Sequence, residues 1–295
     1  MKIAFLTFNQ GHLVSDKEFD SLKKGFSKVG MELIRGIPEE YDVLMVKGWS
    51  HTWEQVVELN VKRKPVLYLS IGTEWKVGNP DNEPIRNLYR NADMVVHIAD
   101  YCMRSHHAVF GFGRTDEIVI IPAREPNLPK EYKEPHLNLK LATTCIPRPV
   151  KRNDQLEELC KKFEIELVPA YGSVSDFSYY HDCDGYIHLS RKEGMPNTVL
   201  EAMSYGLPCI VTNYGGAKEA VGDAGIIIKN DPEDVPWDPD NIEPIDEALF
   251  EDAIEKFKDN HLLLVIKTKE RVLTELNDFV TAYRFKKYLN ENNIF

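Results

Sequence analysis

The sequence predicts an α/β protein built on parallel sheets, and three observations support this fold class. Short apolar runs alternate with amphipathic segments along the chain, as expected for strands and helices of a doubly wound parallel sheet. The 295 residues are enough for two ordinary domains. A charged stretch at residues 127–138 contains two prolines and divides the pattern, so we expect it to be an interdomain linker.

The first domain is predicted to span residues 1–135. Its first strand is the apolar run at residues 2–8, and a loop with Gly11 and His12 follows. The later elements are assigned from short apolar runs and from segments that alternate charged and apolar faces. We expect strands at residues 31–34, 42–46, 66–70, 94–98 and 118–121, and helices at residues 16–29, 52–61, 84–92 and 101–110.

The second domain is predicted to span residues 136–270, and it opens with a strand, a basic loop and a helix. The same rules assign the elements that follow it. We expect strands at residues 139–144 and 165–169, and helices at residues 154–163, 177–183, 247–260 and 261–290. The last of these is long enough to run back toward the first domain.

The most informative stretch lies at residues 184–216. Residues 184–189 and 209–212 are predicted strands, and each is followed by a loop and a helix. Asn197 is expected to cap the first helix, which Gly206 and Pro208 end. Gly215 and Gly216 open the turn into the second helix, at residues 217–221. In an open parallel sheet, loops at the carboxyl ends of strands form the edge where ligands bind.

The residues of these loops fit a nucleotide sugar. A helix N-terminus offers unpaired N–H groups to a phosphate, and Gly194, like the two later glycines, lets the backbone approach a ligand closely. The carboxylates of Glu193 and Glu201 accept hydrogen bonds from hydroxyl groups. The alternative is that these residues bind no ligand: Asn197 only caps a helix at the edge of a Rossmann-like sheet, and the two glutamates are surface residues.

The ordered motif gives a family resemblance. Residues 193–201 read E-G-x-P-N-x-x-x-E, followed by A-M-x-x-G-x-P and by G-G-x-x-E ending at Glu219. This set resembles the carboxyl-terminal half of retaining glycosyltransferases of family 4, which are glycogen-synthase-like and have the GT-B fold. The similarity is specific over residues 184–228. It implies two Rossmann-like domains with a cleft between them, and a C-terminal helix at residues 271–295 that returns to the first domain.

The resemblance also implies which residues bind the donor. Glu193 would hold the sugar hydroxyls and Glu201 the ribose. A basic loop would hold the diphosphate, although its usual G-R-L start is replaced here by C-I-P at residues 145–147; the alternative is a solvated charged loop. The donor-binding set implied is Arg148, Lys151, Arg152, Tyr171, Gly172, Glu193, Gly194, Met195, Pro196, Asn197, Thr198, Glu201, Gly215 and Gly216.

The first domain departs from the family. Its loop after the fourth strand reads S-I-G-T-E-W-K without the usual His, and Ser70 or Thr73 stands near that place. Residues 122–126 read P-A-R-E-P where the family often has P-N-G. His12 and His51 follow the first and third strands and join Glu193 as catalytic candidates. The alternative for each His is a solvated loop residue.

The resemblance implies a retaining hexosyltransferase that moves a hexose-type sugar from a UDP- or GDP-linked donor to a glycan or lipid-linked acceptor. We expect no metal and no cofactor, because basic groups and the helix N-terminus would stabilise the leaving diphosphate. One alternative is a virus-type enzyme that glycosylates modified DNA bases. Another is an inactive protein that only binds nucleotide sugars.

The composition restricts the binding partners and the cellular location that we expect. The net charge of −11 disfavours a general nucleic-acid or anionic-membrane binder. Five cysteines without a C-x-x-C pair suggest reduced thiols and no zinc site. No apolar run approaches the roughly 20 residues of a membrane span, and the first residues enter a strand directly. We therefore expect a cytoplasmic protein, and no pattern indicates its oligomeric state.

Overall fold

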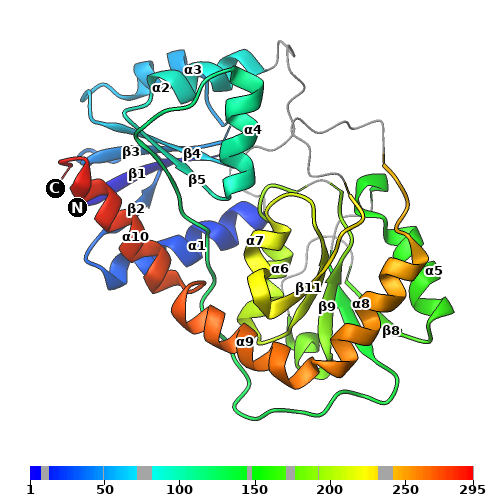
Figure 1. Cartoon of the computed structure of the whole chain (residues 1–295). Helices are drawn as coiled ribbons and strands as arrows, with labels where there is room; N and C mark the ends of the chain where they lie inside the picture. The colour runs from blue at the N-terminus through cyan, green and yellow to red at the C-terminus, as the bar shows by residue number, and fades with distance from the viewer. Residues whose placement is uncertain are drawn as a thin grey trace. The chain divides into compact units, whose positions relative to one another are not determined.

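The computed structural model describes residues 1–7, 13–48, 50–71, 82–144, 148–170, 177–191, 193–231 and 242–294. Within these ranges the chain forms two compact units (Figure 1). Of the described residues, those up to Ala123 and from Asp278 onward belong to the first unit, and those from Arg124 to Asn277 belong to the second. Among the described residues the chain therefore crosses between the units after Ala123 and again after Asn277.

The first unit is built on a parallel sheet. Its described strands form one six-stranded sheet in the order β2-β1-β3-β4-β5-β6, with every neighbouring pair parallel. Strands β3 and β4 are buried along their whole length, as expected for a sheet covered on both faces. The elements are β1 (Lys2–Leu6), α1 (Leu13–Lys28), β2 (Glu32–Arg35), β3 (Val43–Lys47), α2 (Trp53–Leu59), β4 (Val66–Ser70), α3 (Glu83–Asn91), β5 (Met94–His97), α4 (Asp100–Phe110) and β6 (Glu117–Val119).

The C-terminal helix α10 (Asp278–Glu291) belongs to the first unit, as the sequence predicted. It packs against α1, where the rings of Phe26 and Phe285 meet edge to face with centroids 5.3 Å apart. The amide of Val95 donates a hydrogen bond of 3.2 Å to the hydroxyl oxygen of Tyr288, which ties α10 to β5. These contacts bring the end of the chain back onto its first domain.

The second unit has its own parallel sheet. The strands described in it form one five-stranded sheet in the order β11-β10-β9-β7-β8. Its strands and helices are β7 (Lys140–Thr143), α5 (Asn153–Lys162), β8 (Glu166–Pro169), β9 (Gly185–His188), α6 (Asn197–Ser204), β10 (Cys209–Thr212), α7 (Ala217–Val221), β11 (Gly225–Ile228), α8 (Glu247–Asp259) and α9 (His261–Thr274), with 3₁₀ turns at Pro149–Lys151, Ser178–Asp182 and Gly222–Ala224.

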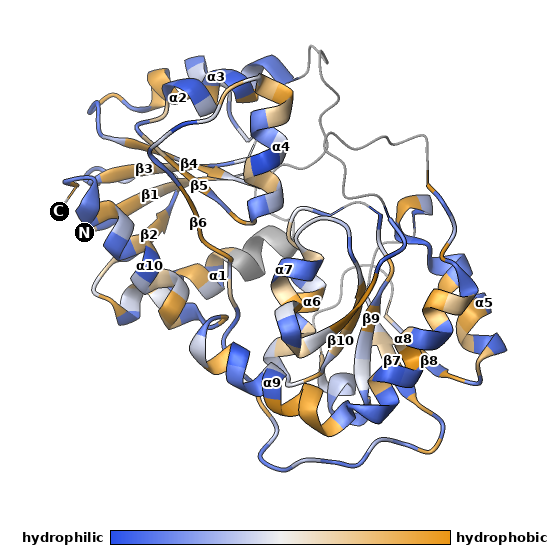
Figure 2. Ribbon diagram, in the orientation of Figure 1, coloured by the Kyte–Doolittle hydropathy of each residue, from blue (hydrophilic) through white to orange (hydrophobic). Residues whose placement is uncertain are grey.

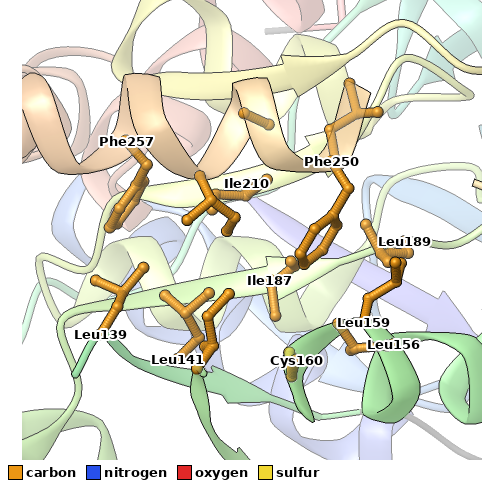
Figure 3. Close-up of a cluster of buried hydrophobic side chains, with 14 of the residues drawn as sticks. Leu139, Leu141, Leu156, Leu159, Cys160, Ile187, Leu189, Ile210, Phe250 and Phe257 are labelled. Atoms are coloured by element: carbon orange, nitrogen blue, oxygen red, sulfur yellow. The ribbon is translucent and has the colours of Figure 1, made fainter. Parts of the chain in front are cut away.

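The core of the second unit lies between its sheet and α8. Phe250 and Phe257 point from α8 toward the strands that carry Leu141 and Ile187 (Figure 3). Gly185 makes this close approach possible, because a Cβ there would lie 2.4 Å from the Phe257 ring. In both units the strands are mainly hydrophobic, whereas helices such as α5 and α8 alternate hydrophobic and hydrophilic residues (Figure 2). No helix in the described part of the chain combines the length and the apolar character that crossing a bilayer requires.

Three expectations need correction. The single helix predicted at residues 261–290 is broken at residues 275–277, where the Asn277 side chain donates to the carbonyls of Val272 and Leu273 and ends α9. The predicted helix at residues 177–183 is only a 3₁₀ turn. The predicted linker at residues 127–138 makes its contacts within the second unit, where Tyr132 bonds His261 and His136 bonds Asp184.

Candidate functional site

The strand order of the second unit locates a site. Strands β7 and β9 lie side by side, but the chain leaves β7 toward β8 on one side and continues from β9 toward β10 on the other. Such a reversal opens a crevice at the carboxyl ends of the two strands. The loops that follow these strands carry Lys151 and Glu193. They are joined where the Arg191 amide donates to the carbonyl of Val150 at 2.8 Å.

The loop after β10 is fastened to the same place. The amide of Gly216 donates to the carbonyl of Gly194 at 2.8 Å. Gly215 has φ +65°, and a Cβ at this position would lie 2.1 Å from the carbonyl oxygen of Glu193. Only glycine fits there, since the backbone is in the left-handed region and the space is already filled. The predicted meeting of the two motif loops is therefore present in the structure.

Glu193 lies at the centre of this edge and accepts two hydrogen bonds. One comes from the Lys151 ammonium group, and the other from Nε2 of His188 at 2.7 Å. Burial alone would raise the pKa of Glu193, but the Lys151 charge and the His188 hydrogen bond lower it to about 2. The side chain keeps 14% exposure. Glu193 is thus a fixed, ionised acceptor that a hydroxyl-bearing ligand can still reach.

Arg152 occupies a different environment from its neighbours in the basic loop. It is buried, and its Nη1 donates to Asp231 Oδ2 at 3.0 Å and to the Leu189 carbonyl at 3.2 Å. Arg191 meets the same carboxylate through Nε at 3.3 Å. The guanidinium of Arg152 therefore serves an internal ion pair that anchors the loop. Lys151 lies beside Glu193, and Arg148 is exposed at the rim of a surface hollow of about 640 Å³.

The start of α6 differs from the expectation. Pro196 occupies the capping position, and no side chain caps the helix there; Asn197 is its first helical residue. The amide oxygen of Asn197 instead accepts a hydrogen bond of 2.6 Å from Nη2 of Arg124. Glu201 lies one turn further along, with Oε1 3.9 Å from Arg124 Nε. Arg124 is thus linked to two of the predicted donor-binding residues.

The other predicted residues lie as follows. Gly194 and Thr198 are half-buried in the loop and the first turn of α6, where Met195 and Pro196 are buried. His51 belongs to the first unit, just after β3; its Nδ1 lies 3.0 Å from Ser50 Oγ, and burial lowers its pKa. His12, Tyr171 and Gly172 fall outside the described residues.

Ser70 ends β4 and is buried against His106 of α4, with Oγ 3.2 Å from Nε2. Burial lowers the pKa of His106 to about 3, so the ring is neutral at neutral pH. Its Nδ1 lies 2.9 Å from the carbonyl of Cys102 and must donate to it, which leaves Nε2 to accept the Ser70 proton. Ser70 is therefore held inside the first unit. Thr73 lies outside the described residues.

Two residues of this edge were missed by sequence reasoning. Arg124 precedes the second sheet by a long stretch and matches no family motif. His188 is the last residue of β9, and its place directly before the motif loop is a signal that could have identified it. Across the described ranges, no group of three or more His, Cys, Asp or Glu side chains is arranged to hold a metal ion.

Comparison with known proteins agrees with the position of this edge. Residues 126–236 match the family model described as Glycosyl transferases group 1. The O-antigen biosynthesis glycosyltransferase WbnH and the probable O-antigen biosynthesis glycosyltransferase WbiN, both of Escherichia coli, are each 32% identical over 102 residues. That match covers 34% of this chain and only 30% of each relative.

Solved structures are similar along nearly the whole chain. Anabaena HepE, crystallised in complex with UDP, has a TM-score of 0.68 and 13% identity, covering 99% of this chain and 100% of that one. Sucrose-phosphate synthase from Thermosynechococcus elongatus has a TM-score of 0.65 and 13% identity, covering 99% and 98%. With the two parallel sheets, these similarities confirm the predicted GT-B fold.

Proposed function

We propose that this protein is a group 1 glycosyltransferase that binds a nucleotide-diphosphate sugar at the β7–β9 edge of its second unit. It moves a hexose-type sugar to a glycan or lipid-linked acceptor, with retention of the anomeric configuration. The observation that carries the proposal is the contact of Lys151 and His188 with Glu193 at the strand-order reversal. All three residues lie inside the segment that matches the glycosyltransferase family.

The chemistry of the three side chains suits this reaction. An ionised carboxylate accepts hydrogen bonds and pairs with sugar hydroxyls, which is the role proposed for Glu193. An ammonium group pairs with phosphate oxygens, which is the role proposed for Lys151, with Arg148 beside it. When the bond between sugar and diphosphate breaks, negative charge develops on the leaving phosphate, and fixed positive charge nearby lowers that barrier.

The comparisons support the donor and the acceptor classes. HepE was crystallised with UDP, and the E. coli relatives are named for O-antigen biosynthesis. We infer a UDP- or GDP-linked donor and a saccharide acceptor of the cell-surface kind. A DNA acceptor fits less well, because the chain carries a net charge of −11 and would repel a polyanion.

The direct test is turnover of a panel of UDP- and GDP-linked hexoses, with hydrolysis measured alone and transfer measured with lipid-linked saccharides. We expect slow hydrolysis of one donor and faster transfer when an acceptor is added. Product anomers read by NMR test retention. Tight nucleotide-sugar binding without any turnover would instead identify a binding protein, and failure to bind any nucleotide sugar would contradict both.

Replacing Lys151 by alanine is expected to weaken binding of the free nucleoside diphosphate by roughly 1–3 kcal/mol, the scale of a lost charged hydrogen bond. Calorimetric titration of UDP and GDP measures this. His51→Ala is the matched comparison, because His51 belongs to the first unit and should leave nucleotide affinity unchanged. The assignment of the donor to the second unit is wrong if His51→Ala weakens binding and Lys151→Ala does not.

Turnover is expected to survive chelation by EDTA, because side-chain and helix-terminal positive charge is proposed to stabilise the diphosphate in place of a metal. The measurement is the initial transfer rate after dialysis against EDTA, with and without added Mg²⁺ or Mn²⁺. Comparable rates in all samples would agree with this expectation. Strict dependence on either ion would mean that the phosphate site includes a metal.

A further inference from the structure

Arg124 is the first residue of the second unit and is almost entirely buried, with 7% exposure. Its main chain is held by a parallel bridge to Asn277. From there its side chain reaches helix α6, where it meets Asn197 and Glu201. Burying a guanidinium costs folding free energy unless nearby groups pair with its charge and accept its hydrogen bonds. We therefore expect this arginine to have a role in the site that it contacts or in its support.

The contact with Asn197 fixes the orientation of an amide. A guanidinium has only N–H donors, so the atom that faces it at 2.6 Å must be the amide oxygen. The NH₂ group of Asn197 is then turned away from Arg124 and can donate to another partner. Without Arg124 the amide would be free to rotate by half a turn and present its oxygen instead.

The contact with Glu201 works through charge as well as geometry. Arg124 Nε lies 3.9 Å from Glu201 Oε1, and the Glu201 side chain is 13% exposed. At this distance the contact is an ion pair without a hydrogen bond, in which the guanidinium charge attracts the carboxylate. One residue therefore contacts both a donor group and an acceptor group on the same face of α6, one turn apart.

We propose that Arg124 is a positioning residue that holds Asn197 and Glu201 in the orientation that recognises the ribose of the nucleotide. It thereby sets a preference for ribonucleotides over nucleotides lacking ribose hydroxyls. This inference rests on the proposed function, since it deepens the assignment of the same donor site. It also explains why an arginine suits residue 124: lysine offers one compact ammonium group, which cannot serve an amide and a carboxylate with a planar fork.

The experiment compares binding of UDP and of 2′,3′-dideoxy-UDP by calorimetry, with GDP and its dideoxy analogue as the second pair. The wild type is expected to prefer the ribonucleotide by about tenfold or more, the scale of a hydrogen bond to a charged group. Arg124→Ala and Glu201→Gln should each reduce that preference to about twofold or less, and Arg124→Lys should restore part of it. Arg114→Ala, which removes a half-buried arginine–carboxylate pair from the first unit, should leave the preference unchanged.

The double variant Arg124→Ala/Glu201→Gln separates positioning from structural support. If Arg124 acts through Asn197 and Glu201, the double variant loses less ribose preference than the product of the two single losses. Independent, multiplying losses would overturn the inference, as would full ribose preference in folded Arg124→Ala. Thermal unfolding identifies folded variants, and Arg124→Lys replaces Arg124→Ala in the cycle if the latter does not fold. If the wild type binds neither nucleoside diphosphate, the proposed function itself fails.

Discussion

Replacing Glu193 by alanine is expected to lower kcat by about 100-fold or more at saturating donor, the scale found for preorganised electrostatic groups. The carboxylate is fixed by Lys151 and His188 and is ionised, since its pKa is lowered to about 2. Its removal deletes an acceptor for the sugar hydroxyls and releases Lys151 from its partner. The measurement is the initial rate of transfer over a range of donor concentrations.

Two further variants sharpen this prediction. Glu193→Gln keeps the shape but removes the charge that holds Lys151, so it should also lose most of the activity. Glu166→Ala is the matched control, because Glu166 is an exposed glutamate on β8 that pairs with Lys140. We expect wild-type kcat from this control. Near-normal kcat in folded Glu193→Ala would remove Glu193 from the catalytic assignment.

The sequence predicted correctly those features that depend on a few consecutive residues. Continuous apolar runs such as Val43–Lys47 and Val66–Ser70 are strands buried along their whole length, and their shortness is the local signal that identifies them. The glycine pair at residues 215 and 216 was predicted to open a turn, and the structure shows that a Cβ at Gly215 would collide with the carbonyl of Glu193. Local signals of this kind need no knowledge of strand order.

Contacts between distant residues could not be predicted in this way. Lys151 and Glu193 meet because β7 and β9 are neighbours, and strand order cannot be read from one sequence. Arg152 was grouped with Arg148 and Lys151 as a phosphate ligand, yet its partner Asp231 lies 79 residues away. The sequence does not distinguish a buried arginine such as Arg152 from an exposed one such as Arg148, so the difference in their burial appears only in the tertiary structure.

Two helix ends differ from the sequence prediction. The break between α9 and α10 comes from the Asn277 side chain, which bonds the last carbonyls of α9, and residues 271–280 contain no glycine or proline. At α6 the expected cap was moved by one residue, because Pro196 takes the capping position and Asn197 turns to Arg124 instead. The contact at the end of α9 is local, whereas the contact of Asn197 with Arg124 joins residues 73 positions apart.

The buried ion pair of Arg152 leads to the largest stability effect that we expect. The side chain of Asp231 is fully buried and forms ion pairs with Arg152 and Arg191. The Asn213 side chain accepts a hydrogen bond of 3.0 Å from the backbone amide of Asp231 and donates one of 2.6 Å to the backbone carbonyl of Asp231. Removing one partner of a buried pair leaves an uncompensated charge inside the protein. Asp231→Asn keeps the shape of the side chain but leaves two buried guanidinium groups without their carboxylate.

We therefore expect Asp231→Asn to lower the free energy of unfolding of the second unit by about 3–5 kcal/mol, measured by urea denaturation. Asp223→Asn is the matched control, because Asp223 pairs with Lys267 while remaining largely exposed, and it should change stability little. The loss should also reach the site, since Arg152 follows Lys151 directly and fixes the loop that presents it. Equal stability of the two variants would show that the arginines find other partners, and that the Asp231 cluster is not what holds Lys151 beside Glu193.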